Sequence, residues 1–160
     1  RWSAAAAPEL ALRLVAALTW YWWLRGLRSE ATPFADAVLA AVGPEPPPGL
    51  AEEYVLCLIH ASDTATGIEP IVRRLDGPLR HPYLFLLWAF SPRPKAKEGE
   101  RLAALIGPDP WSRAFARIGD GLGAQYGGRI ADAEAHFAAA LAGFRELGDR
   151  WGAASALEKL

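Results

Sequence analysis

The sequence has no methionine, a single cysteine and no surplus of basic residues. One cysteine, Cys57, excludes an intramolecular disulfide and is typical of a reducing compartment, so we expect a cytoplasmic protein. The formal net charge is −1, whereas domains that bind nucleic acid usually carry a basic excess that neutralises phosphates. We therefore expect no direct contact between this segment and nucleic acid.

Long apolar runs are also lacking. A transmembrane helix needs about 20 consecutive apolar residues, but the run from Leu10 to Leu24 is shorter and is interrupted by Arg13. The composition therefore predicts no membrane segment. Because the chain begins at Arg1 rather than at a methionine and ends in a sequence that still favours helix, we expect it to be a fragment of a longer protein.

The sequence does contain many prolines and glycines at positions where helices would start or end. Hydrophobic residues make up 52% and charged residues 22%, which is typical of a globular domain. Proline and glycine divide the chain into segments of helical length, and no segment alternates as a strand would. About nine helices are predicted, near 8–24, 33–42, 50–61, 66–75, 82–90, 95–106, 110–126, 130–147 and from 149 onward. The fold class is therefore all-α.

Three predicted helix starts carry recognisable cap signals. Thr32 precedes Pro33 as an N-cap precedes a first-turn proline. Thr66 with a glutamate three residues later is a capping box, and Asp109 caps a helix that begins at Pro110. The short breaks favour antiparallel neighbours, and helix pairs beginning near 9, 50, 81, 110 and 149 have the spacing of helical repeats.

The C-terminal third resembles a known repeat. Residues 128–141, with small Ala133 and aromatic Phe137 in a glycine-led helix, resemble the second helix of a tetratricopeptide repeat. Residues 144–152 resemble the junction into a next repeat, with Trp151 close to the position of its first-helix aromatic. The resemblance implies antiparallel helix pairs stacked as a right-handed superhelix, an α–α solenoid.

A narrower resemblance joins both ends of the chain. The junction at 144–152 and the tryptophan-rich segment 18–26 are similar to the helical repeat region of large bacterial, actinobacterial-type transcriptional regulators of the SARP and large LuxR classes. The resemblance implies one repeat domain over 1–160, clearest over 110–160 and irregular over 44–108. In such regulators the repeats bind a ligand or partner, and the DNA-binding and NTPase domains lie elsewhere.

The residue groups that could form a nucleotide site, a metal site or a catalytic nucleophile do not occur in the sequence context that such sites require. Gly121, Gly123 and Gly127 form a loose glycine pattern within a predicted helix rather than between a strand and a helix, and no phosphate-binding loop follows. Cys57 and His60 are three residues apart on a helix, but a zinc site needs three or four ligands. The apolar neighbours of Cys57 also disfavour a thiolate. We therefore expect no catalytic activity, no cofactor and no metal.

The first helix is apolar on nearly every side. Leu10, Leu14, Leu18 and Tyr21, together with Ala17, follow helical spacing along one side, and Val15, Ala16, Trp22 and Trp23 cover the others. A helix of this kind is typically buried between neighbours, so we expect it to be an inner helix.

The tryptophan cluster of this helix is the feature with functional promise. Trp20, Trp22 and Trp23 cannot all point one way, because successive helical residues turn by about 100°. Tryptophan is enriched at binding hot spots, and Arg13 lies two turns before Trp20 on the same side. The candidate partner-binding residues are therefore Arg13, Trp20 and Trp23. The alternative is that these rings fill the space between stacked helices.

These patterns predict an interaction module and not an enzyme. We expect the repeat region of a cytoplasmic transcriptional regulator that binds a partner protein, a peptide or a neighbouring domain of the same chain. The alternative is a small-molecule sensor with a pocket between helices near Trp20 and Trp23. The oligomeric state is left open.

Overall fold

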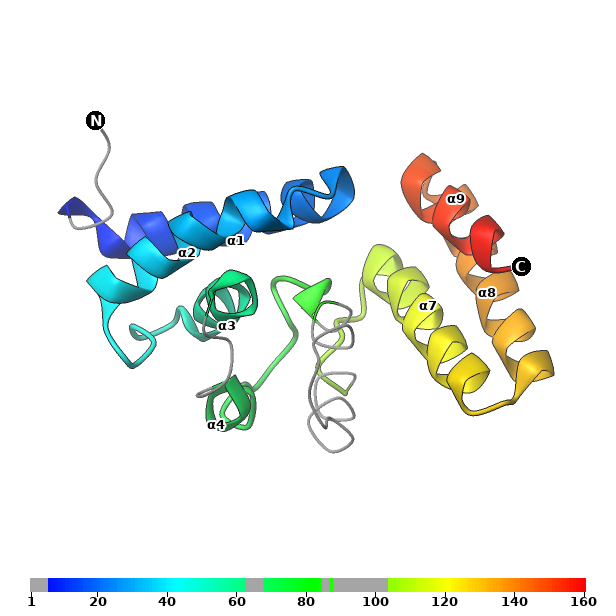
Figure 1. The fold of residues 1–160 in the computed structure, drawn as a ribbon. Helices are drawn as coiled ribbons and strands as arrows, with labels where there is room; N and C mark the ends of the chain where they lie inside the picture. The colour runs from blue at the N-terminus through cyan, green and yellow to red at the C-terminus, as the bar shows by residue number, and fades with distance from the viewer. Residues whose placement is uncertain (1–5, 63–67, 85–86, 88–103) are drawn as a thin grey trace. The chain divides into compact units, whose positions relative to one another are not determined.

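The computed structural model describes residues 6–62, 68–84, 87 and 104–160 (Figure 1). Within these ranges the chain is helical and contains no strand, which confirms the all-α class. The helices are α1 (Pro8–Arg25), α2 (Arg28–Val42), α3 (Ala51–His60), α4 (Ile68–Val72), α7 (Pro110–Tyr126), α8 (Ile130–Glu146) and α9 (Arg150–Lys159). Most of the helices expected over 82–90 and 95–106 lies outside the described residues, as does Thr66.

The described residues form two compact units. The first ends at Asp76 and contains α1 to α4, with α1 packed on α2 and α3, and α2 and α4 each packed on α3. The second begins at Gly77 and contains α7 to α9, with α8 packed on both α7 and α9. Each unit thus has its own helix–helix core.

The end of α1 is closed by backbone hydrogen bonds. Gly26 has a φ of 68°, a left-handed conformation that glycine adopts without steric cost. Its N–H donates to the carbonyl of Trp23 at 3.2 Å, and the N–H of Leu27 donates to the carbonyl of Trp22 at 2.9 Å. This turn satisfies carbonyls at the end of α1 and leads directly into α2.

Helix α2 begins earlier than the cap signal predicted. It starts at Arg28, so Pro33 lies inside the helix and Thr32 is not its N-cap, and that prediction is wrong. Thr32 Oγ1 instead faces the carbonyl of Arg28 one turn back, at 3.5 Å. A proline here removes one backbone donor, and the burial of one side of α2 compensates for that loss. The buried residues of this side are Ala31, Ala35 and Val38.

Helix α3 is the central helix of the first unit. All of its residues except Ala51 are buried, because α1, α2 and α4 all pack against it. The hydroxyl of Tyr54 donates to the carbonyl of Gly43 at 2.8 Å, which ties α3 to the end of α2. The inner position that we expected for α1 is thus occupied by α3.

Small residues facing aromatic rings hold the second unit together. A Cβ atom at Gly121 of α7 would overlap the ring of Phe137 of α8, and one at Gly152 of α9 would overlap the ring of Phe144. Both rings are fully buried, and Ala133 packs in the same cluster as Phe137. The close approach of helices that the small-and-large pattern predicted is therefore present.

Aspartate caps begin two helices of this unit. Asp109 Oδ1 accepts from the N–H of Ser112 at 2.9 Å, as the sequence predicted for the start of α7. Asp149 Oδ1 accepts from the N–H of Gly152 at 2.8 Å at the start of α9. These caps satisfy backbone donors that have no partner within the helix.

Candidate binding surfaces

An apolar ridge runs along α1. It consists of Leu10, Leu14, Leu18, Tyr21 and Leu24, whose exposed fractions lie between 43% and 52%. The expectation that this side is buried is therefore wrong. Helices α2 and α3 contact the opposite side, where Ala11, Leu12, Val15, Ala16, Thr19 and Trp22 are buried.

The three residues predicted to bind a partner are divided between two places. Arg13 is exposed and Trp20 is half-buried, and their spacing of two helical turns puts both beside the ridge. Trp23, also half-buried, lies further round the helix, where the guanidinium of Arg28 sits 4.8 Å from its ring centroid. This cation–π contact joins the end of α1 to the start of α2.

Trp22 is the tryptophan that enters the core. It is buried, and its ring stacks on Phe34 of α2 with centroids 6.2 Å apart. The ring of His60, at the end of α3, meets it edge to face at 5.6 Å. For Trp22 the core-filling alternative is therefore correct.

His60 is a buried polar residue without a full set of partners. Only 5% of the residue is exposed, and its Nε2 atom has no hydrogen-bond partner among the described residues. Burial, with a smaller contribution from the positive charge of Arg28, lowers its pKa to about 4, so its ring is neutral at pH 7. Burying a polar nitrogen without a hydrogen-bond partner costs about 1–3 kcal/mol, because the hydrogen bond to water is lost and not replaced.

A small cavity adjoins His60 within the first unit. It has a volume of about 220 Å³ and is lined by Arg28, Ser29, Thr32, Ile59, His60 and Ala61. The lining is mainly polar and comes from the first turn of α2 and the end of α3. The cavity was not predicted, because the sequence signals indicated a start of α2 at Pro33, beyond most of the residues that form the cavity. The sequence signal that could have indicated the cavity is the group of one cation and two hydroxyls, Arg28, Ser29 and Thr32, shortly after Gly26.

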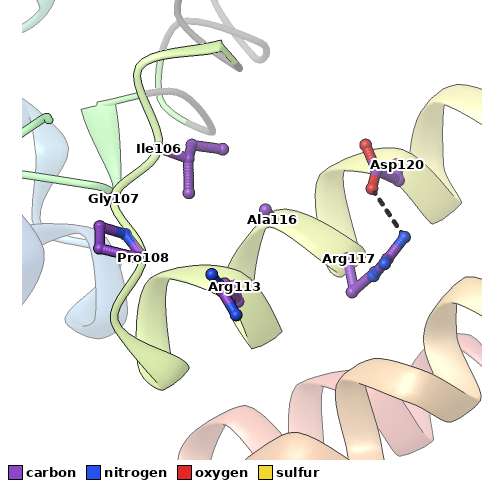
Figure 2. A pocket seen from close by; sticks show the side chains of 7 residues that line it. All are labelled: Ile106, Gly107, Pro108, Arg113, Ala116, Arg117 and Asp120. Carbon is purple, nitrogen blue, oxygen red and sulfur yellow. Dashed lines mark ion pairs between the residues drawn. The ribbon is translucent and has the colours of Figure 1, made fainter. Parts of the chain in front are cut away.

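The second unit has a wider hollow along α7 (Figure 2). Its volume is about 570 Å³, and its lining residues are Ile106, Gly107, Pro108, Arg113, Ala116, Arg117 and Asp120. In Figure 2 the side chain of Arg117 extends toward Asp120, with which it forms an exposed ion pair at 3.6 Å. Arg113 and Arg117 also line a neighbouring hollow of about 410 Å³ between α7 and α8. This surface offers charge for polar contacts, and no residue of its lining is a nucleophile held by a base.

The other groups considered for chemistry are the thiol of Cys57 and the side chains that could bind a metal ion. Burial raises the pKa of the Cys57 thiol to about 12, and its Sγ faces the carbonyl of Ala35 at 3.5 Å. In the part of the chain that the structure describes, no three His, Cys, Asp or Glu side chains gather closely enough to hold a metal ion. None of the described helices combines the length and the apolar character that crossing a membrane requires.

Comparisons with family models, with curated proteins and with solved structures give no match. What bears on function is therefore the ridge of α1, the small cavity beside His60 and the hollow along α7.

Proposed function

We propose that the chain is a protein-interaction module, the tetratricopeptide-like repeat region of a cytoplasmic transcriptional regulator. Its helix pairs, about nine helices in all, stack as a right-handed superhelix and bind a partner protein, a peptide or a neighbouring domain of the same chain. The observation that carries this proposal is the apolar ridge of α1. Contiguous exposed apolar surface of this kind marks interaction sites on soluble proteins.

The shape of the ridge favours a helical partner. Its members follow each other at three- or four-residue steps over more than three turns, which is the spacing of a helix-to-helix contact. Arg13 and Arg25 are exposed and flank the ridge on opposite sides. The complementary partner is therefore an amphipathic helix with an apolar stripe bordered by acidic residues.

A repeated cap supports the repeat architecture. The Asp-x-Trp sequence of Asp109 and Trp111 recurs forty residues later at Asp149 and Trp151, and both aspartates cap their helices through the same backbone position. A spacing of this size lies in the range of helical-pair repeats. The α7–α8 pair and the helix that follows it, α9, thus begin in the same way.

Site-specific crosslinking in the full-length protein tests the interaction proposal. A photoreactive phenylalanine analogue at Leu14 should crosslink to one defined helical segment, and Tyr21→Glu should abolish that product by placing a charge on the ridge. The matched control carries the analogue at Leu157, an exposed leucine of α9. A crosslink between two copies of the chain would identify self-association, and equal products from Leu14 and Leu157 would contradict a dedicated surface.

A small-molecule sensor is the second proposal, with its pocket between helices near Trp20 and Trp23. It is supported by the cavity at Arg28, because this residue contacts the ring of Trp23. A ligand there should shift tryptophan fluorescence and raise the melting temperature, and Trp23→Phe should remove the fluorescence shift. Unchanged fluorescence and melting temperature across a metabolite screen would count against it.

A further inference from the structure

We draw no further inference here: the strongest candidate, the hollow along α7 lined by Arg113, Arg117 and Asp120, carries nothing because Arg117 and Asp120 already pair with each other and nothing among the described residues shows what covers it.

Discussion

The indole Nε1 of Trp111 donates to Asp149 Oδ2 at 2.7 Å, while the other oxygen of the same carboxylate accepts from the N–H of Gly152 at 2.8 Å. Asp149 therefore links the first turn of α7 to the first turn of α9 and caps α9 at the same time. Asp109, its counterpart at the start of α7, accepts from Ser112. Variants of Asp149 and Asp109 can therefore be compared to separate the contribution of the helix cap to stability from that of the link to Trp111.

Asp149→Ala should lower the free energy of unfolding of the second unit by about 2–3 kcal/mol, since it removes a cap and leaves the half-buried indole of Trp111 without its acceptor. Asp109→Ala should cost only about 1 kcal/mol because it removes a cap. Hydrogen exchange of the α9 and α7 amides measures both changes. Equal costs for the two variants would show that the indole contact adds nothing.

Gly121 and Gly123 lie two residues apart in α7 and should respond to alanine in opposite directions. A Cβ at Gly121 would overlap the Phe137 ring, whereas one at Gly123 meets nothing within 4 Å. Gly121→Ala should destabilise the second unit by about 1–3 kcal/mol. Gly123→Ala should stabilise it by about 0.5–1 kcal/mol, because alanine loses less entropy in a helix. Urea unfolding measures both, and a loss of stability in Gly123→Ala would contradict the packing described here.

The thiol of Cys57 should resist modification in the native protein. It is buried, and burial raises its pKa to about 12, so the thiolate that reacts is nearly absent at pH 8. Labelling with a disulfide reagent should be slow in buffer and fast in urea. A Ser29→Cys variant supplies an exposed thiol as the control. Equal native rates for the two thiols would place Cys57 at the surface instead.

His60 should make the protein less stable in mild acid. Its pKa is lowered from 6.5 to about 4 in the native state, so the unfolded chain takes up a proton first as the pH falls. The stability is complete above pH 6.5 and is lost progressively between pH 6.5 and 4, by about 3 kcal/mol at most.

His60→Phe isolates this contribution because it keeps an aromatic ring against Trp22 and does not titrate. Replacing the unpaired polar ring should also leave stability at pH 7 unchanged or increased. Urea midpoints from pH 4 to 7 measure the difference, and the carboxylates contribute equally to both proteins. Parallel pH profiles would show that His60 is not buried in its neutral form.

Local signals predicted most helix ends of the second unit. Asp109 before Pro110 located the start of α7, and the glycines after Tyr126 and Leu147 located the ends of α7 and α8 within a residue. The same reasoning failed at α2, where Thr32 and Pro33 look like a helix start. The packing of α2 against α1 and α3 extended the helix toward Arg28 in spite of the proline.

The candidate binding residues were only partly predictable. The tryptophan-rich helix was recognised, but its sequence is apolar on nearly every side and does not show which side is covered. The ridge of Leu10, Leu14, Leu18, Tyr21 and Leu24 is exposed because α2 and α3 contact the opposite side. The cavity beside His60 is formed by α2 and the end of α3, which are separated in the chain, so no local sequence pattern predicts it.

The sequence by itself determined that the described chain is helical and where most of its helices break, because caps, prolines and glycines act on hydrogen bonds between residues at most a few positions apart. The tertiary structure alone decided that α3 is the central helix, that Trp22 packs on His60 and that Arg28 lies over Trp23. Those contacts follow from which apolar faces become buried against one another, and burial stabilises any well-packed pair of faces without regard to their separation in the chain.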